Sequence, residues 1–401
     1  MKVSGLTSRI RGLSREVILL GVVSLLADVS SEMLTPVAPL FLTLVIGASA
    51  TDLGLIEGVA ESLASLLKGV SGRWSDRIGK RRPFIVSGYL LTALAKPLVG
   101  VSRAWPQVLA ARALDRLGKG IRGAPRDALI ADSVPLSEQG RAFGWHRSMD
   151  TLGAIIGPLL TLGLMALVTS NLRSLYMIAF VPGLVAVGVT LLVRDIKPAG
   201  GEAAEKREET KPPLERKFKS YLVVWALFSL GNSSDAFLIL RAKTIGFSTI
   251  QTILVYSLYN LIYCGTSPWL GSLADRFGKA RIVALGFAVF AAVYAGFAST
   301  SDKTSLVWLF AIYGIYAAST DGVGKAYAVE LLPKSARGYG IGLLGMVTGL
   351  LALSASLIGG WLWDHVSPES TFYFGALGAL CALLAFAALN LWTSRQTAIQ
   401  T

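Results

Sequence analysis

Apolar stretches long enough to cross a lipid bilayer recur along the whole chain, and they restrict its possible folds more than any other feature. A helix needs about 20 apolar residues to span the hydrocarbon core. Twelve candidate spans are present, at residues 17–46, 51–72, 84–101, 105–128, 139–168, 173–193, 220–243, 248–271, 281–299, 305–330, 337–363 and 370–393. The first continues without a cleavage site, so it is interpreted as an uncleaved helix. The sequence therefore predicts an all-α membrane protein with twelve transmembrane helices.

The charged residues are few and lie mostly between these spans. They make up 16% of the chain, against roughly 25% in soluble domains. The net charge of +13 lies mainly in short loops, which indicates membrane topology rather than a nucleic-acid partner. Two cysteines and two histidines indicate neither a disulfide framework nor a metal site. No soluble enzymatic domain is visible in the sequence, so we expect neither an enzyme nor a cofactor. The sequence also shows no nucleotide-binding motif, so we do not expect transport driven by ATP.

The longest polar stretch divides the chain into two near-equal parts. Residues 195–219 contain proline, glycine and charges of both signs, which is typical of a linker. The predicted domains are therefore residues 1–194, this linker, and residues 220–401. Loop lysines and arginines gather on the side of the linker and the two termini. The positive-inside rule then places both termini in the cytoplasm, in a bacterial-type inner membrane.

The two halves repeat each other. The sequence GRWSDRIGKR at 72–81 follows the second span, and GSLADRFGKA at 271–280 follows the eighth. Four further pairs match in register: Ser30-Ser31-Glu32 with Ser233-Ser234-Asp235, Asp115-x-x-Gly118-Lys119 with Asp321-x-x-Gly324-Lys325, Arg141-x-x-Gly144 with Arg337-x-x-Gly340, and Gly153 with Gly349. This pattern indicates duplication of a six-helix unit, an arrangement that transporters use to build a site between repeats.

The repeated loop sequence G-x-x-x-D-R-x-G-K resembles the signature loop motif of the major facilitator superfamily, in both of its expected places. The resemblance covers essentially the whole chain. It implies alternating access around a central cavity, a monomer, and a cytoplasmic latch that holds the outward-facing state. Positive-inside topology alone explains loop arginines but not the repeated motif. The latch residues would be Gly72, Asp76, Arg77, Gly79, Lys80, Gly271, Asp275, Arg276 and Gly278.

The fourth span carries a stripe of charged residues. At helical spacing the stripe covers about 21 Å of one helix face. Its members are Arg112, Asp115, Arg116, Lys119, Arg122 and Arg126. Charges within a span are costly and face a cavity or a partner. Arg116-x-x-Lys119-Gly120 also resembles the family's Arg-Gln-Gly motif, which implies proton transfer, but lysine in place of glutamine favours anion binding. Anchoring at the membrane edge is the alternative, above all for Arg122 and Arg126.

Acidic residues in the first two spans are candidates for proton coupling. Asp28 and Glu32 lie one turn apart, as do Glu57 and Glu61. Paired carboxylates resist simultaneous ionisation and can therefore take up protons. The alternative is that they form structural ion pairs with the stripe. Further candidates for solute binding or proton coupling are Asp150, Asp235, Arg241, Asp321 and Lys325. Arg241 is equally consistent with anchoring at the membrane edge.

The fifth span contains glycines at a distinctive spacing. Gly144, Gly153 and Gly157-Pro158 resemble the antiporter motif of drug and other exporters, although the motif's closing glycine pair is absent here. Close packing of small residues is the alternative. The spacing favours export over import.

These features favour a proton-coupled antiporter that exports a small anionic, zwitterionic or drug-like solute. A symporter that imports an organic anion is a second hypothesis, because fold alone does not exclude it. A metal-cation exporter is a third. The stretches LADVSSEML and RLGKGIRGAPRDALIAD resemble bacterial nickel-resistance and multidrug exporters, but few histidines and cysteines are present. A non-transporting membrane sensor is the last, and it would not need charges on several spans.

Overall fold

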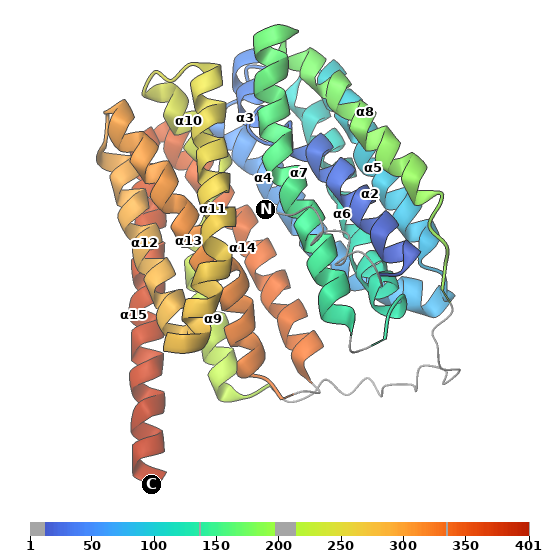
Figure 1. Ribbon diagram of the computed structural model, residues 1–401. Helices are drawn as coiled ribbons and strands as arrows, with labels where there is room; N and C mark the ends of the chain where they lie inside the picture. Colours follow the sequence, from blue (N-terminus) through green and yellow to red (C-terminus); the bar gives the residue numbers. More distant parts are fainter. Residues whose placement is uncertain (1–12, 136–137, 197–213, 334–335, 401) are drawn as a thin grey trace, which may run out of the picture. The chain divides into compact units, whose positions relative to one another are not determined.

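The computed structural model describes residues 13–135, 138–196, 214–333 and 336–400. The N-terminal tail and most of the predicted linker, residues 197–213, lie outside these residues. The described chain is helical throughout and contains no strand (Figure 1). The predicted all-α architecture is therefore confirmed.

Each predicted span corresponds to one helix or to one set of broken helices. The first span is α2 (Arg15–Glu32), α3 (Ala38–Leu40) and the π-helical turn η1 (Phe41–Val45), and the seventh is α9 (Arg216–Gly231) with α10 (Ala236–Thr244). The others are α4 (Ala50–Ile78), α5 (Arg82–Val101), α6 (Trp105–Asp132), α7 (Gln139–Leu167), α8 (Leu172–Thr190), α11 (Thr249–Phe277), α12 (Lys279–Ser299), α13 (Lys303–Glu330), α14 (Arg337–His365) and α15 (Pro368–Gln400).

Eight of the spans in the described chain are apolar and long enough to qualify as membrane-crossing helices by composition alone. The remaining four are those of α2, α4, α6 and α11. The first three carry the charged residues singled out above, and α11 is rich in hydroxyl-bearing side chains. The candidate functional residues therefore concentrate on the least apolar helices.

The two copies of the loop motif begin inside helices rather than after them. Helices α4 and α11 each extend six residues beyond their predicted ends, to Ile78 and Phe277. The residue that follows each helix is a glycine with positive φ: Gly79 has φ +69° and Gly278 has φ +97°. Glycine adopts this conformation without steric cost, so the motif glycine ends the helix.

Two spans are broken near the paired Ser-Ser-acid sequences. Glu32 is the last residue of α2, and Pro36 lies in the break that follows. Proline lacks the backbone N–H that would continue the helical hydrogen bonds. Asp235 is the N-cap residue of α10, after a non-helical Asn232 with ψ 79°. Broken helices of this kind place polar groups at the binding sites of many transporters.

The described helices form two compact units. Of the described residues, the first comprises 13–35, 66–102, 110–135 and 138–196, and the second comprises 36–65, 103–109, 214–333 and 336–400. In the first unit, α2 packs against α7 and α8, and α5 packs against α8 (Figure 1). In the second, α12 packs between α13 and α15, and α11 packs on α13. The N-terminal part of α4 belongs to the second unit, and its C-terminal part belongs to the first.

A turn outside the spans shows how the helix starts are fixed. Asp302 is the N-cap of α13, and its carboxylate accepts hydrogen bonds from the Ser305 N–H at 2.8 Å and the Ser305 hydroxyl at 3.0 Å. These bonds favour the ionised form. They therefore hold the pKa of the Asp302 carboxyl below its usual value.

Candidate functional site

Helix α7 lies directly against the acidic face of α2. A Cβ at Gly153 would lie 2.7 Å from the Cβ of Asp28, and a Cβ at Gly157 would lie 2.8 Å from the Cβ of Glu32. Real side chains do not approach so closely, so only glycine permits this packing. The structure thus brings two glycines of the predicted antiporter motif together with the predicted acidic pair. Gly144 has no such neighbour, and Pro158 is buried.

Polar contacts reinforce the packing of α2 on α7. The Ser24 hydroxyl donates a hydrogen bond to Asp150, and His146 Nδ1 lies 3.6 Å from the Asp150 carboxylate. The Thr161 hydroxyl donates to the Met33 carbonyl, 2.7 Å away, which is one of the unsatisfied acceptors at the end of α2. Asp150 therefore links α7 to α2, and it lies between Gly144 and Gly153 of the glycine motif.

The predicted stripe on α6 is partly buried inside the first unit. Asp115 lies between two arginines, with 3.8 Å to the Arg112 guanidinium and 4.0 Å to Arg116 Nε. All three side chains are about one-fifth exposed. This position excludes a lipid-facing stripe.

The lower part of the stripe packs against α5. The Arg122 side chain is only 5% exposed. Its guanidinium lies 4.0 Å from the Tyr89 ring centroid and donates to the Thr92 hydroxyl at 3.0 Å. This placement does not fit the membrane-edge alternative for Arg122. Arg126 is paired with Asp127 at 2.9 Å.

Lys96 on α5 is a buried charge that the sequence-based candidates did not include. Its ammonium group donates to the Thr92 carbonyl at 3.2 Å, and Asp115 is the carboxylate that acts most strongly on it. A single lysine in an apolar span is itself the sequence signal, because an unpaired charge there is costly.

The acids of α2 and the bases of α6 form one charged cluster. The basic groups that act on Glu32 are Lys119, Arg116 and Arg112. Asp28 experiences the charges of Asp150 and Lys119. The predicted stripe and the predicted acidic pair are therefore electrostatic neighbours within the first unit.

The remaining acidic candidates lie in the second unit, where two of them are bonded to tyrosines. Asp235 accepts hydrogen bonds from the hydroxyls of Tyr313 at 2.7 Å and Tyr259 at 3.4 Å. Asp321 accepts one from Tyr263 at 2.9 Å and lies 4.0 Å from Lys325. The tyrosines were absent from the sequence-based candidates, although Tyr256, Tyr259 and Tyr263 recur at helical spacing on α11. The charge of Glu57 acts on Asp235. Glu61 is exposed.

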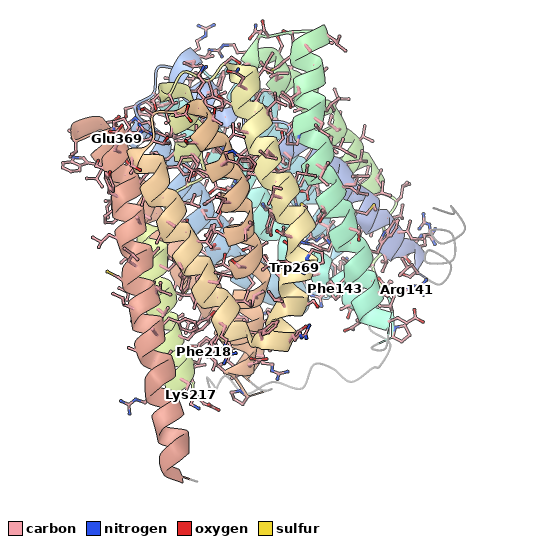
Figure 2. All side chains as sticks on the ribbon, turned by 60° about the vertical axis from the view of Figure 1, so that its left-hand side comes forward. Arg141, Phe143, Lys217, Phe218, Trp269 and Glu369 are labelled. Atoms are coloured by element: carbon pink, nitrogen blue, oxygen red, sulfur yellow. The ribbon has the colours of Figure 1, made fainter. Side chains whose placement is uncertain are left out.

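Arg241 is occupied by contacts that hold helix ends together. It forms an ion pair with Glu369 at 2.6 Å. Figure 2 shows Glu369 at the start of α15. Arg241 also donates to the carbonyls of Phe297 at 3.0 Å and Thr300 at 3.1 Å, at the end of α12. A cation at a helix C-terminus satisfies free carbonyls. These contacts favour a structural role over solute binding.

In both loop motifs the aspartate is bonded within its own loop. Asp76 pairs with Arg81, and Asp275 lies 3.4 Å from Lys279, which also pairs with Glu330. The other charged motif residues, Arg77, Lys80 and Arg276, are exposed. Of the two small motif residues that precede them, Gly72 has Ala124 beside it and Gly271 has open space. The latch role of the motif stays a prediction.

The start of α5 is held by a residue assigned above to the linker. Asp195 Oδ1 accepts hydrogen bonds from the backbone N–H groups of Arg81 and Arg82, both at 2.8 Å. A carboxylate at a helix N-terminus caps free N–H groups and complements the helix dipole. Asp195 is therefore part of the first unit.

Asp364 makes a corresponding contact in the second unit and was not anticipated. From the last turn of α14, its carboxylate accepts hydrogen bonds from the N–H groups of Ala50 at 3.1 Å and Thr51 at 2.7 Å, and from the Thr51 hydroxyl at 2.6 Å. The backbones are close here, because a Cβ at Gly54 or Gly360 would overlap the opposite helix. The start of α4 is thus tied to the end of α14.

Comparison with known proteins identifies the relatives of this chain. The family model of the Major Facilitator Superfamily matches residues 20–240 and 230–399. An uncharacterised MFS-type transporter of Methanocaldococcus jannaschii is 37% identical over 92% of this chain and 94% of its own length. A multidrug resistance efflux pump PmrA homologue of Lactococcus lactis is 24% identical over 89% of this chain and 91% of its own.

Solved structures show the same fold. A crystal structure of a single-residue mutant of the nucleoside transporter NupG superposes with a TM-score of 0.79 at 11% identity, over 94% of this chain and all of that chain. A POT family transporter in complex with 5-aminolevulinic acid gives 0.78 at 13% identity, over 96% and 97%. Sequence identities this low show that the fold is shared and carry no information about function.

Proposed function

We propose that this chain, which belongs to the Major Facilitator Superfamily, is a secondary active transporter that exports a small zwitterionic or drug-like solute in exchange for protons. The observation that carries the proposal is the packing of Gly153 and Gly157 directly against Asp28 and Glu32. It places two partly buried carboxylates at a helix interface where glycine leaves no opposing side chain. Efflux pumps among the relatives are consistent with this direction of transport.

The charged cluster of the first unit supplies a physical reason for exchange. It contains six basic side chains and five carboxylates: Lys96, Arg112, Arg116, Lys119, Arg122 and Arg126, with Asp28, Glu32, Asp115, Asp127 and Asp150. When Asp28 and Glu32 take up protons, the cluster gains net positive charge. Coulomb interactions are strong in a low-dielectric interior. A positively charged solute group therefore competes with protons, whereas an anion is favoured by them.

The two main hypotheses therefore differ in the sign of the proton change. A solute with a positive group releases protons when it binds, which is the requirement for antiport. A purely anionic solute, drawn to Arg112 and Arg116, takes up protons with it, which is the requirement for symport. The sign of the proton change thus separates the proposed exporter from the anion importer.

Transport in proteoliposomes tests the proposal directly. With a pH-sensitive dye inside and the membrane potential clamped by potassium and valinomycin, an outward gradient of the solute should drive proton entry. The variant Glu32→Gln should lose this coupled flux, and Glu215→Gln, which removes an exposed carboxylate at the start of α9, should retain it. Solute movement with no proton movement in the wild type would refute exchange.

We further propose that the contact of Asp364 with the start of α4 is a gate. Helix α4 lies in the first half of the sequence and α14 in the second, so alternating access between the halves requires this contact to break and re-form. The Asp76 and Asp275 loops are proposed to serve the opposite state. Both termini are proposed to be cytoplasmic, and the protein is proposed to act as a monomer in the inner membrane.

The metal-exporter and sensor hypotheses have less support. Within the described chain, no group of three histidine, cysteine, aspartate or glutamate side chains is placed to hold a metal ion. A sensor would not require acidic residues at a glycine-lined helix interface. Neither an enzymatic activity nor a cofactor is proposed.

A further inference from the structure

One carboxylate of the second unit lies in an unusual environment. Asp235 is partly buried at the break between α9 and α10, and the polar groups bonded to it are the hydroxyls of Tyr313 and Tyr259. Both are neutral donors. Hydrogen bonds of this kind orient a carboxylate, but they do not balance its charge.

The charge of Asp235 is not compensated by an ion pair among the described residues. The paired basic side chains of this unit bind other carboxylates: Arg241 with Glu369, Lys279 with Asp275 and Glu330, and Lys325 with Asp321. The charged groups that act most strongly on Asp235 are themselves acidic, namely Asp321 and Glu57. The acids of the first unit, in contrast, lie beside the bases of α6. A buried carboxylate in this position is neutralised either by a proton or by a positive charge that arrives from outside.

Aromatic rings cluster around this carboxylate. The ring centroids of Tyr259 and Tyr313 are 5.1 Å apart, those of Tyr313 and Tyr316 are 5.0 Å apart, and Tyr263 stacks on Tyr259 at 6.4 Å. Tyr294 and Tyr316 also lie within the electrostatic reach of Asp235. The faces of such rings attract cations, most strongly where water is excluded.

Two further observations suit a ligand rather than plain packing. The hydroxyls of Ser233 and Tyr294 are buried near Asp235 without a hydrogen bond of normal geometry. Farther along α11 and α13, Tyr263 donates to Asp321, whose side chain is 60% exposed. A buried acid, a series of tyrosines and an exposed acid thus follow one another on neighbouring helices.

We propose that the second unit contains a binding site for the positively charged group of an organic solute, formed by Asp235 and the rings of Tyr259 and Tyr313. An organic ammonium or phosphonium ion matches the chemistry of this site, because one carboxylate and several ring faces stabilise such a cation. A bare metal ion does not fit, because it needs several oxygen or nitrogen ligands. This inference rests on the proposed function in one respect: the positively charged group that binds here is taken to belong to the solute that is exchanged for protons.

Equilibrium binding of tetraphenylphosphonium to purified protein in nanodiscs tests this site. Tetraphenylborate, which has nearly the same shape and opposite charge, serves as the ligand control. Empty nanodiscs measure partitioning into lipid. We expect the wild type to bind the cation in a saturable manner and to show no saturable binding of the anion that depends on Asp235.

Substitutions locate the site. Loss of the charge in Asp235→Asn should weaken binding of the cation by about tenfold or more, because one partner of a desolvated ionic contact is removed. Tyr313→Leu, which removes a ring, should weaken it by about two- to thirtyfold. Glu330→Gln, a matched loss of a carboxylate on α13 that is paired with Lys279, should leave binding unchanged.

Equal binding by wild type and Asp235→Asn would overturn the inference, as would equal saturable binding of the two tetraphenyl ions to the wild type. The second comparison needs no variant, so it decides the question even where Asp235→Asn does not fold. Glu32→Gln leaves the Asp235 site intact and should still bind the cation in a saturable manner, although more weakly, because the charged cluster of the first unit is then more positive. Binding that survives in Glu32→Gln but is lost in Asp235→Asn supports the site even if proton exchange fails, so the two proposals are separable.

Discussion

The contact of Asp364 with the first turn of α4 predicts how much the opening of this turn should be favoured when the carboxylate is removed. Asp364→Ala removes the acceptor of two backbone hydrogen bonds and one hydroxyl hydrogen bond. Loss of a helix cap costs about 0.5–2 kcal/mol. Because Asp364 is exposed, we use the middle of this range, about 1 kcal/mol, which corresponds to roughly fivefold more frequent opening. Asp364→Asn keeps an acceptor and should have a smaller effect.

Hydrogen exchange read by mass spectrometry measures this opening. In Asp364→Ala, backbone amides at the start of α4 should exchange about fivefold faster than in the wild type, because their capping acceptor is gone. Asp302→Ala removes a comparable cap from α13 in the same unit and should accelerate exchange only there. Unchanged exchange at Thr51 in Asp364→Ala would refute the proposed gate, since the contact would then contribute nothing to closure.

Three further substitutions follow from the same contacts. Gly157→Ala should lower the melting temperature by several degrees through about 1–3 kcal/mol of overpacking, whereas Gly144→Ala, with open space around it, should not; equal effects would contradict the close packing of α7 on α2. Glu369→Gln should destabilise the protein by about 1 kcal/mol in thermal unfolding, because it weakens a partly exposed pair with Arg241; an unchanged melting temperature would show that the carbonyls alone hold Arg241. Arg122→Lys should lower the melting temperature, since lysine keeps the charge but loses the planar contact with a tyrosine ring, and a fully stable variant would argue against that contact.

Hydropathy predicted the twelve spans because the length of a bilayer-crossing helix is fixed by the solvent around it. It did not predict the breaks before α3 and α10, because hydropathy averaged over the length of a span hides the short polar stretches around Glu32 and Asp235. The ends of α4 and α11 were placed too early for a related reason. Charged motif residues lower the hydropathy of the last turns, yet these turns stay helical until Gly79 and Gly278.

The first-unit cluster was predictable in part. Charges at helical spacing indicated the stripe on α6 and the acids on α2, and the glycine spacing indicated a specialised α7. That these three features meet depends on how α2, α6 and α7 pack, which no local pattern encodes. The tyrosines around Asp235 were missed because aromatic residues at helical spacing are more often core than site. The contact of Asp364 with Thr51 joins residues more than 300 positions apart and has no local signal.

The proposed exchange depends on competition between the solute and protons. Protons bind to Asp28 and Glu32 in the charged cluster of the first unit, and a positively charged solute favours the form of the cluster that has lost them. The most direct test is the proton change when tetraphenylphosphonium is added to purified wild-type protein in a weakly buffered solution. We expect release of protons from the wild type and none from a variant that combines Asp28→Asn with Glu32→Gln. Proton uptake, or release that persists in this double variant, would contradict the proposed competition.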